Sequence, residues 1–309
     1  MSQIASVSIA RPLNEVAEEL GRSFEEYGFA VIRDHGIPAE LITRAEELSK
    51  QFFALPDVAK RAYHVSGGGG ARGYTPFGTE RAKDAEVHDL KEFWHVGRSL
   101  PEGHPLAEYM QPNLWPDEIP GFRETFAELY AAFEKAGGRV LEAIALHLGL
   151  PREWFARTVE DGNSVMRLLH YPPLTAGQAE GAIRAAAHGD INTITLLLGA
   201  EEAGLELLTA EGQWLAIDVP EGALVVNIGD MLERLTNGKL RSTTHRVVNP
   251  RGPAAYRSRY SMPFFLHFRP DFTIETLDSC IDPAAPDDHP APISSHEFLL
   301  QRLREINLA

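Results

Sequence analysis

The stretch AAAHGDINTITLLL, residues 185–198, places a histidine and a carboxylate at the start of an apolar run rich in β-branched residues. Because side chains alternate faces along a strand, His188 and Asp190 are expected to point to the same side. Two buried polar groups on one face cost free energy unless something satisfies them. The stretch therefore predicts a strand with a functional site at its mouth.

Similar runs follow one another from Asn163 onward: SVMRLLHYPP, TITLLLGA, LELLTAEGQWLAI, GALVVNIGD, LRSTTHRVV and RSRYSMPFFLHF. Short apolar runs with turn residues between them are typical of an antiparallel sandwich or jelly roll. Within the third run, Glu211 and Gly212 are expected to form a hairpin turn. The second half of the chain is therefore predicted to contain a mainly β core.

Helical periodicity dominates the first half of the chain and its last residues. Apolar residues recur every three to four positions in PLNEVAEELGRSFEEYGF, PAELITRAEELSKQFFALP, GFRETFAELYAAFEKAGGRVLEAIALHLGLP and SSHEFLLQRLREI. The run FAVI, beginning at Phe29, is expected to be a short buried strand. The third and longest helix is expected to support a sheet, with a kink at Gly137 and Gly138.

Composition limits the class of protein. The chain has 309 residues, 44% hydrophobic and 24% charged, which suffices for one large or two modest cores. Its formal net charge of −15 disfavours nucleic acid as a partner, because phosphate binding needs a basic surface. No apolar run approaches the length of a membrane span, so we expect no membrane partner.

Cysteine usage and the N-terminal sequence bear on the compartment. Cys280 is the single cysteine, which excludes an intrachain disulfide and a cysteine-based zinc site. The first residues, MSQIASVSIARPL, lack the basic-then-apolar pattern of a secretory signal. A reducing, cytoplasmic setting is the expectation.

Four consecutive glycines, residues 67–70, occur in SGGGGARGY. A phosphate-binding loop would need a following Gly-Lys-Ser/Thr and a strand-to-helix context, and neither is present. We interpret the segment as a flexible loop, and whether it acts as a lid stays open. Arg72 and Tyr74, just beyond it, are candidates to line a substrate entrance.

A third chemical group joins the first two much further along the chain. His245 projects from the strand-like run RSTTHRVV, on the face shared by alternate residues of that run. Two histidines and one carboxylate, with coordination positions left open, form the facial triad of non-haem Fe(II) oxygenases. We therefore predict a metal site made by His188, Asp190 and His245.

A carboxylate clamp is predicted one strand later. Arg259 and Ser261 are two residues apart in RSRYSMPFF and so share a strand face. A guanidinium offers a bidentate fork to a carboxylate, and the serine hydroxyl adds a further hydrogen bond. Arg167, in the earlier run SVMRLLHYPP, has the same parity as Leu169 and Tyr171 and is therefore a candidate inward-facing residue. It could bind an acidic substrate, or it could lie at a strand end with its charged group in water.

Other functions use some of these residue types. A zinc hydrolase would use similar ligands but would leave Arg259 and Ser261 without a role. A non-catalytic jelly-roll binding protein would have no need of three metal ligands. An oxidase that needs only Fe(II) and O₂ stays possible, because the clamp indicates only that some carboxylate is bound.

These motifs together resemble the isopenicillin N synthase-like group of 2-oxoglutarate/Fe(II)-dependent oxygenases. The His-x-Asp…His…Arg-x-Ser pattern matches His188, Asp190, His245, Arg259 and Ser261, and the flanking VVNIGDMLERLTNGKLRSTTHRVVNP and HYPP match as well. Toward the N-terminus the resemblance rests on YGFAVIRDHGI, FFALP, RGYTPFG and DLKEFWHVG. It covers nearly the whole chain.

The resemblance implies an α+β fold with a mainly β core: a double-stranded β-helix of the jelly-roll or cupin type with flanking helices. It implies Fe(II) at the predicted triad, 2-oxoglutarate as cosubstrate bound by Arg259, Ser261 and Tyr171, and O₂. Many plant relatives have an asparagine at the position of Leu169, and this asparagine makes an additional hydrogen bond to the cosubstrate. A leucine side chain cannot make that hydrogen bond. The closest alternative is isopenicillin N synthase itself, an oxidase that uses no 2-oxoglutarate.

The implied reaction is the oxidation of an unidentified small molecule, by hydroxylation or desaturation, with release of succinate and CO₂. The implied organisation is an N-terminal region at 1–120, a supporting long helix at 121–160, a jelly-roll core at 161–275 and a C-terminal loop and helix at 276–309. No obligate protein partner is evident from the sequence.

Overall fold

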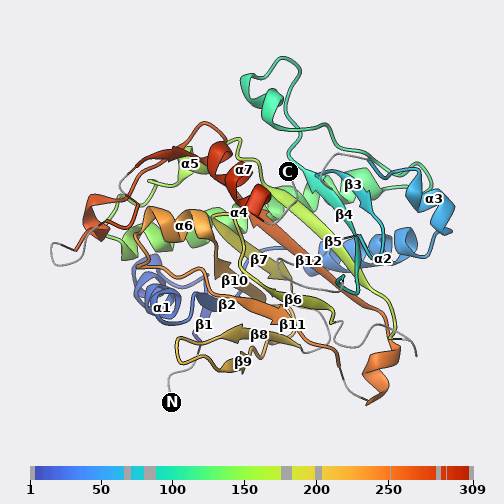
Figure 1. The fold of residues 1–309 in the computed structure, drawn as a ribbon, viewed down its shortest axis with the longest axis horizontal. Helices are drawn as coiled ribbons and strands as arrows, with labels where there is room; N and C mark the ends of the chain where they lie inside the picture. Colours follow the sequence, from blue (N-terminus) through green and yellow to red (C-terminus); the bar gives the residue numbers. More distant parts are fainter. Residues whose placement is uncertain are drawn as a thin grey trace.

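The computed structural model describes residues 4–65, 71–79, 88–174, 183–198, 204–250, 252–282, 287–289 and 291–305. Two sheets face each other, and helices cover the outer side of the larger one (Figure 1). This arrangement confirms the predicted mainly β core with flanking helices. Residues 67–70, predicted to be a loop, lie outside the described residues.

The larger sheet, which we call the major sheet, is antiparallel except where β1 pairs with β2. Its strands, in spatial order, are β1 (Ser6–Ser8), β2 (Phe29–Arg33), β10 (Leu224–Ile228), β7 (Ile194–Leu198), β12 (Arg259–Leu266), β5 (Val165–Tyr171), β4 (Glu92–Gly97) and β3 (Gly73–Thr75). The predicted strand at Phe29 is thus built into the same sheet as the C-terminal core.

The smaller sheet, the minor sheet, faces the inner side of the major one. Its order is β6 (Ala185–His188), β11 (His245–Val247), β8 (Leu205–Leu208) and β9 (Trp214–Ala216). The turn between β8 and β9 contains Gly212 with a φ of 77°, as the predicted hairpin requires. A separate two-stranded ribbon joins β13 (Thr273–Ile274) to β14 (Ile293–Ser294).

The predicted helices form near their expected boundaries. The longer ones are α1 (Leu13–Glu26), α2 (Ala39–Phe53), α4 (Phe122–His147) and α7 (Ser295–Glu305). The shorter ones are α3 (Asp57–Arg61), α5 (Ala156–Val159) and α6 (Asp230–Leu235), with 3₁₀ turns at Pro105–Tyr109, Gly252–Tyr256 and Asp278–Cys280. Phe133 of α4 stacks on Phe264 of β12 at a ring-centroid distance of 5.1 Å, which joins the long helix to the major sheet as predicted. No helix in these ranges combines the length and apolarity needed to cross a membrane.

Helix α4 continues through the two glycines at which we predicted a kink. A Cβ on Gly137 would lie 2.5 Å from Leu266 Cδ1 of β12, whereas a Cβ on Gly138 would meet nothing within 4 Å. Gly137 therefore permits close approach of helix and sheet.

The adjacent glycines should respond oppositely to the same substitution. Gly137→Ala forces a side chain into Leu266 and should destabilise the fold by about 1–3 kcal/mol. Gly138→Ala meets open space and should stabilise the helix by up to about 1 kcal/mol. Urea unfolding of both variants measures the effect, and equal shifts would contradict the packing role of Gly137.

A buried polar network lies on the helix side of β4. Lys60 Nζ and His170 Nδ1 each lie 2.7 Å from a carboxylate oxygen of Glu92, and the Tyr74 hydroxyl donates to Glu92. Burial by itself would raise the pKa of Glu92, but the hydrogen bonds from His170, Lys60 and Tyr74 lower it. The network joins α3 to strands β3, β4 and β5 of the major sheet.

The prediction that Arg72 and Tyr74 line a substrate entrance is wrong. Tyr74 is 1% exposed and packs in the helix-side core, while Arg72 is 3% exposed and donates to the carbonyls of Gln111 and Ala71. Tyr74 of β3 pairs with Trp94 of β4 and shares its outward face, which points away from the space between the sheets.

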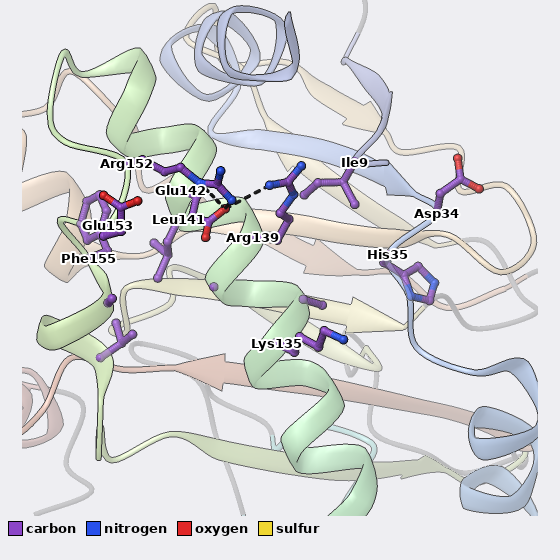
Figure 2. A pocket seen from close by; sticks show the side chains of 14 residues that line it. Ile9, Asp34, His35, Lys135, Arg139, Leu141, Glu142, Arg152, Glu153 and Phe155 are labelled. Atoms are coloured by element: carbon purple, nitrogen blue, oxygen red, sulfur yellow. Dashed lines mark hydrogen bonds and ion pairs between the residues drawn. The ribbon is translucent and has the colours of Figure 1, made fainter. Parts of the chain in front are cut away.

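A pocket of about 410 Å³ lies against α4, on the side reached by the segment after β2 (Figure 2). Its charged lining includes Arg139 and Arg152, both hydrogen-bonded to Glu142. The remaining charged side chains are Asp34, Lys135 and Glu153. Because the pocket is lined by as many acidic as basic side chains, its charge favours neither an anionic nor a cationic ligand.

Candidate functional site

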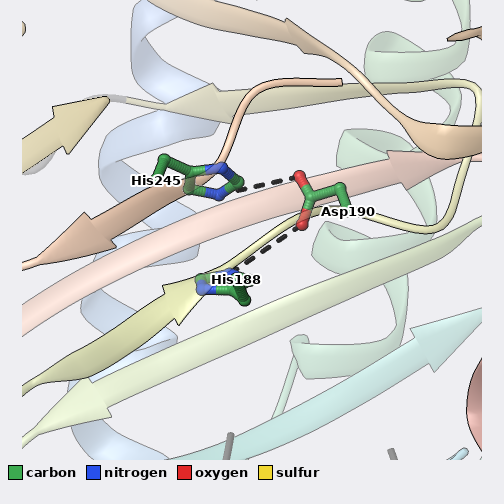
Figure 3. Close-up of side chains that lie close together, drawn as sticks. All are labelled: His188, Asp190 and His245. Atoms are coloured by element: carbon green, nitrogen blue, oxygen red, sulfur yellow. Dashed lines mark ion pairs between the residues drawn. The ribbon is translucent and has the colours of Figure 1, made fainter. Parts of the chain in front are cut away.

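The minor sheet brings the two predicted histidines together. His188 ends β6 and His245 begins β11, and their Cα atoms are register partners. The single strand predicted to carry both His188 and Asp190 is wrong, because β6 ends at His188 and Asp190 lies in the connection to β7 of the major sheet. The Asp190 carboxylate nevertheless faces both imidazoles (Figure 3). One donor atom from each of the three side chains lies within 4.8 Å of the others, the only such group of three or more potential ligands among the described residues.

Both imidazoles are oriented by backbone carbonyls. His188 Nδ1 lies 2.7 Å from the carbonyl oxygen of Ala186, and His245 Nδ1 lies 3.1 Å from that of Thr243. A carbonyl can only accept, so each Nδ1 carries the proton and each Nε2 keeps its lone pair. The Nε2 atoms lie 3.9 Å from the oxygens of Asp190, so the donor set suits a divalent transition metal.

The carboxylate of Asp190 is held by two strands of the major sheet. Its Oδ2 accepts hydrogen bonds from Thr195 Oγ1 of β7 at 2.5 Å and from Asn227 Nδ2 of β10 at 2.9 Å. Its Oδ1 points to His188 Nε2 at 3.9 Å. Sequence patterns predicted no role at the site for Thr195, and they indicated only a structural turn position for Asn227. The inward parity of Thr195 is a weak signal, and no local signal links Asn227 to the site.

Electrostatics favour the metal-binding protonation states. Desolvation by the surrounding protein lowers the pKa of the half-buried His188, and the adjacent His245 lowers it further, so the neutral imidazole is favoured. Burial by itself would raise the pKa of Asp190, but His245, His188 and the hydrogen bonds from Asn227 and Thr195 lower it below its usual range. A neutral His188 beside an ionised Asp190 leaves ligand lone pairs available to a cation. The His188 side chain is 40% exposed, so the group is accessible from that side.

The predicted clamp lies on the inner face of the major sheet. Arg259 and Ser261 of β12 are 4% and 5% exposed, and Arg259 Nη1 lies 3.5 Å from Ser261 Oγ. Tyr171 of β5 is the register partner of Arg259, whose guanidinium lies 5.1 Å from the tyrosine ring centroid. The structure thus brings the three predicted residues together. It adds Arg184, a fully buried residue whose guanidinium lies 5.8 Å from the same ring.

Arg167 faces inward from β5, as its parity predicted. Its Nε donates to His95 Nε2 of β4 at 2.6 Å. Its guanidinium lies 4.2 Å from the ring centroid of Phe93 and 5.4 Å from that of Phe265. Stacking against two rings fixes the plane of the guanidinium beside the space between the sheets. The side chain is half-buried and is held at this wall by its contacts with His95, Phe93 and Phe265.

His267 lies at the end of the same face and titrates abnormally. Burial lowers its pKa to about 4, against a smaller upward effect of the Asp190 carboxylate. The imidazole is 8% exposed and is therefore buried in its neutral form.

Folding stability should depend on pH through this residue. An unfolded histidine takes up a proton near pH 6.5, while native His267 resists protonation until about pH 4. The unfolded state therefore binds more protons between these values, and stability falls as the pH is lowered through that window. The loss from this one group should be about 2–3 kcal/mol at pH 4.5.

Urea unfolding at pH 7.5 and 4.5, with a chelator present, measures this loss. The variant His267→Phe keeps a ring but cannot titrate, so it should lose less stability on acidification than the wild type. An identical loss in both proteins would assign the pH dependence to other groups.

Comparison with known proteins agrees with this geometry. Residues 4–118 match the model of the non-haem dioxygenase in morphine synthesis N-terminal region, and residues 162–268 match that of the 2OG-Fe(II) oxygenase superfamily. The chain is 36% identical over 277 residues to the 2-oxoglutarate-Fe(II) type oxidoreductase hxnY of Emericella nidulans, a match covering 86% of this chain and 78% of that protein.

Solved structures are similar over nearly the whole chain. A protein from Caulobacter crescentus assigned to the 2OG-Fe(II) oxygenase family has a TM-score of 0.91 and 54% identity, with 99% of each chain covered. A full-length Neurospora crassa protein, solved in complex with alpha-KG and thymine, has a TM-score of 0.85 and 27% identity, with 97% of this chain and 96% of that one covered.

Proposed function

Because the chain belongs to the 2OG-Fe(II) oxygenase superfamily, we propose that His188, Asp190 and His245 hold its Fe(II). The observation that carries this proposal is the set of two Nε2 atoms and one carboxylate oxygen on neighbouring elements. Their hydrogen bonds to Ala186, Thr243, Thr195 and Asn227 leave the ligand atoms directed at one point.

The protein is a 2-oxoglutarate/Fe(II)-dependent oxidoreductase, an enzyme that uses Fe(II), 2-oxoglutarate and O₂ to oxidise a small molecule. Bound iron supplies the redox chemistry that couples loss of CO₂ from 2-oxoglutarate, which leaves succinate, to oxidation of the substrate. The protein's own residues bind and orient the reactants and keep water from the site.

We propose that Arg259 and Ser261 bind the carboxylate of 2-oxoglutarate that lies far from the metal. A buried guanidinium beside a hydroxyl matches the two oxygens of a carboxylate. Tyr171, the register partner of Arg259, borders the same place, and the buried charge of Arg184 makes it more favourable to an anion. Leu169 offers no hydrogen bond there, so the guanidinium carries most of the binding.

We further propose the division into 1–120, 121–160, 161–275 and 276–309 as the functional organisation of the chain. The single Cys280 supports a reducing, cytoplasmic setting, and the net charge of −15 argues against nucleic acid as a partner. Small-molecule substrates are the partners that the site would accommodate.

The test begins with the wild-type protein under anaerobic conditions. Adding 2-oxoglutarate to the Fe(II) protein should produce the visible charge-transfer band expected when a 2-oxo acid chelates iron. No band with iron confirmed bound would remove 2-oxoglutarate from the mechanism and favour the oxidase alternative. A screen for succinate release then seeks the substrate, beginning with thymine, which the Neurospora crassa complex contains.

A further inference from the structure

Three polar residues form a line across the inner face of the major sheet. They lie one row beyond Thr195 and Asn227, which donate hydrogen bonds to Asp190 and which we call the Asp190 anchors. Phe265 of β12 pairs with Val165 of β5 and with Thr195 of β7. Continuing that register by two residues places Asn163 and Thr193 on either side of His267. Beyond the ends of the printed ladders the three segments stay adjacent, since Thr193 N donates to the carbonyl of Leu266 and His267 N donates to Ser164 Oγ. We call Asn163, Thr193 and His267 the polar row; β5, β12 and β7 are neighbours in Figure 1.

Each member of the polar row has a buried polar atom that makes no hydrogen bond within the described part of the chain. These atoms are Asn163 Oδ1, Thr193 Oγ1 and His267 Nδ1. Thr193 is 0% exposed and His267 is 8% exposed. A buried polar atom without a partner costs free energy, and such atoms are a small minority in folded proteins. Three of them in one row indicate that a partner binds there.

The polar row adjoins the proposed metal centre. Thr193 is two residues before Thr195, whose hydroxyl donates to Asp190. The negative charge of Asp190 reaches the imidazole of His267. Arg259 and Ser261 lie at the other end of β12, so the polar row stands on the opposite side of the Asp190 anchors from the proposed cosubstrate clamp.

The charges around the polar row define the chemistry that fits it. An anion would face the carboxylate of Asp190 without a positive charge in the row, and a cation would compete with the metal for that carboxylate. Asparagine, threonine and a neutral histidine together offer both donors and acceptors. We propose that Asn163, Thr193 and His267 form the subsite for an uncharged hydrogen-bonding group of the substrate, such as an amide or lactam; this inference rests on the proposed function.

An internal water that satisfied the same atoms would be a purely structural alternative. Thr193→Val distinguishes the two, because it removes the hydroxyl and keeps the shape. The matched control is Thr236→Val, since Thr236 is also 0% exposed but its hydroxyl donates to the carbonyl of Leu232 and accepts from Leu240 N.

The first measurement is the thermal unfolding midpoint of the metal-free protein. Thr193→Val should unfold at or above the wild-type temperature, with a rise of roughly 2–4 °C, because an unsatisfied buried group is removed. Thr236→Val should unfold at a lower temperature. A fall in Thr193→Val like that of the control would show that the hydroxyl already has a partner in the free protein, and would overturn the proposal.

The second measurement uses the anaerobic Fe(II)–2-oxoglutarate protein and three uncharged probes: thymine, nicotinamide and 2-pyrrolidone. At least one should perturb the visible band of the wild type. Its affinity should fall by roughly tenfold in Thr193→Val and in His267→Phe, because the polar atom of the probe loses its partner. The titration of 2-oxoglutarate itself should be unchanged in both variants.

The outcomes separate this inference from the proposed function. A wild type without the band would contradict the proposed function, whereas the unfolding comparison would still test the polar row. A wild type with the band but no response to any probe would overturn the ligand class. Equal probe affinities in the wild type and both variants would overturn the subsite.

Discussion

Asp190→Ala is expected to reduce Fe(II) affinity by more than about 100-fold and to abolish turnover. Losing a group that only orients a metal ligand typically costs 10–100-fold in metal affinity or activity, so losing the carboxylate itself should cost more. The substitution removes the single carboxylate of the donor set and leaves two imidazoles. Anaerobic iron titration, with succinate release as a second readout, measures the effect.

Folding must be separated from metal binding in this experiment. Asp190→Ala leaves Thr195 Oγ1 and Asn227 Nδ2 without their acceptor, so some destabilisation is expected. Asp190→Asn keeps an oxygen for both donors while removing the charge, and it should also bind iron weakly. Asp271→Ala, which breaks only an exposed pair with Arg269, is the matched control. Full iron affinity in both Asp190 variants would refute the proposed ligand set.

Arg259→Lys is expected to weaken 2-oxoglutarate binding by about tenfold to hundredfold. Lysine keeps the positive charge but lacks the planar fork that meets both oxygens of a carboxylate. Loss of a charge-assisted hydrogen bond at a buried site costs on the order of 1.5–3 kcal/mol, which gives this range of affinity. The visible band of the Fe(II) protein should titrate at correspondingly higher 2-oxoglutarate concentration.

The matched control for this variant is Arg269→Lys, whose guanidinium pairs with Asp271 at the surface. It should leave the titration unchanged. Iron affinity in the absence of 2-oxoglutarate should be the same in both variants, because Arg259 is not among the proposed ligands. A wild-type titration curve for Arg259→Lys would mean that the cosubstrate carboxylate binds elsewhere, with Arg184 the next residue to change.

Strand parity and spacing determined the central part of the site. Residues two apart on a strand share a face whatever surrounds them, so Arg259 could be paired with Ser261 from the sequence. The pairing of His188 with Asp190 was predicted on the same ground, but β6 ends at His188 and Asp190 lies in the connection to β7 of the other sheet, so their proximity follows from the short spacing and the fold of this connection. The same local rule placed Arg167 on the inner face, and helical periodicity predicted the boundaries of α1, α2 and α7 closely. Such inferences need only the backbone geometry of one element.

Only the tertiary structure decided which distant residues meet. Asn227 and Thr195 hold Asp190 because β10 and β7 are neighbours in the major sheet, and no local pattern encodes that pairing. The predicted position of Tyr74 at a substrate entrance was wrong for the same reason. Whether its side chain faces an entrance or the helix-side core depends on how β3 pairs with β4.

Alternation within a strand thus determined the carboxylate clamp, and the close spacing of His188 and Asp190 in the sequence determined two of the proposed metal ligands. The hydrogen bonds that hold Asp190 depend on the register between strands far apart in sequence, and so does the polar row beside it. Parity is a property of one chain segment, whereas register follows from the packing of the whole sheet. His267 illustrates the difference: its sequence neighbours do not mark it, and its burial follows from the assembled sheet, in which Thr193 N donates to the carbonyl of the adjacent Leu266.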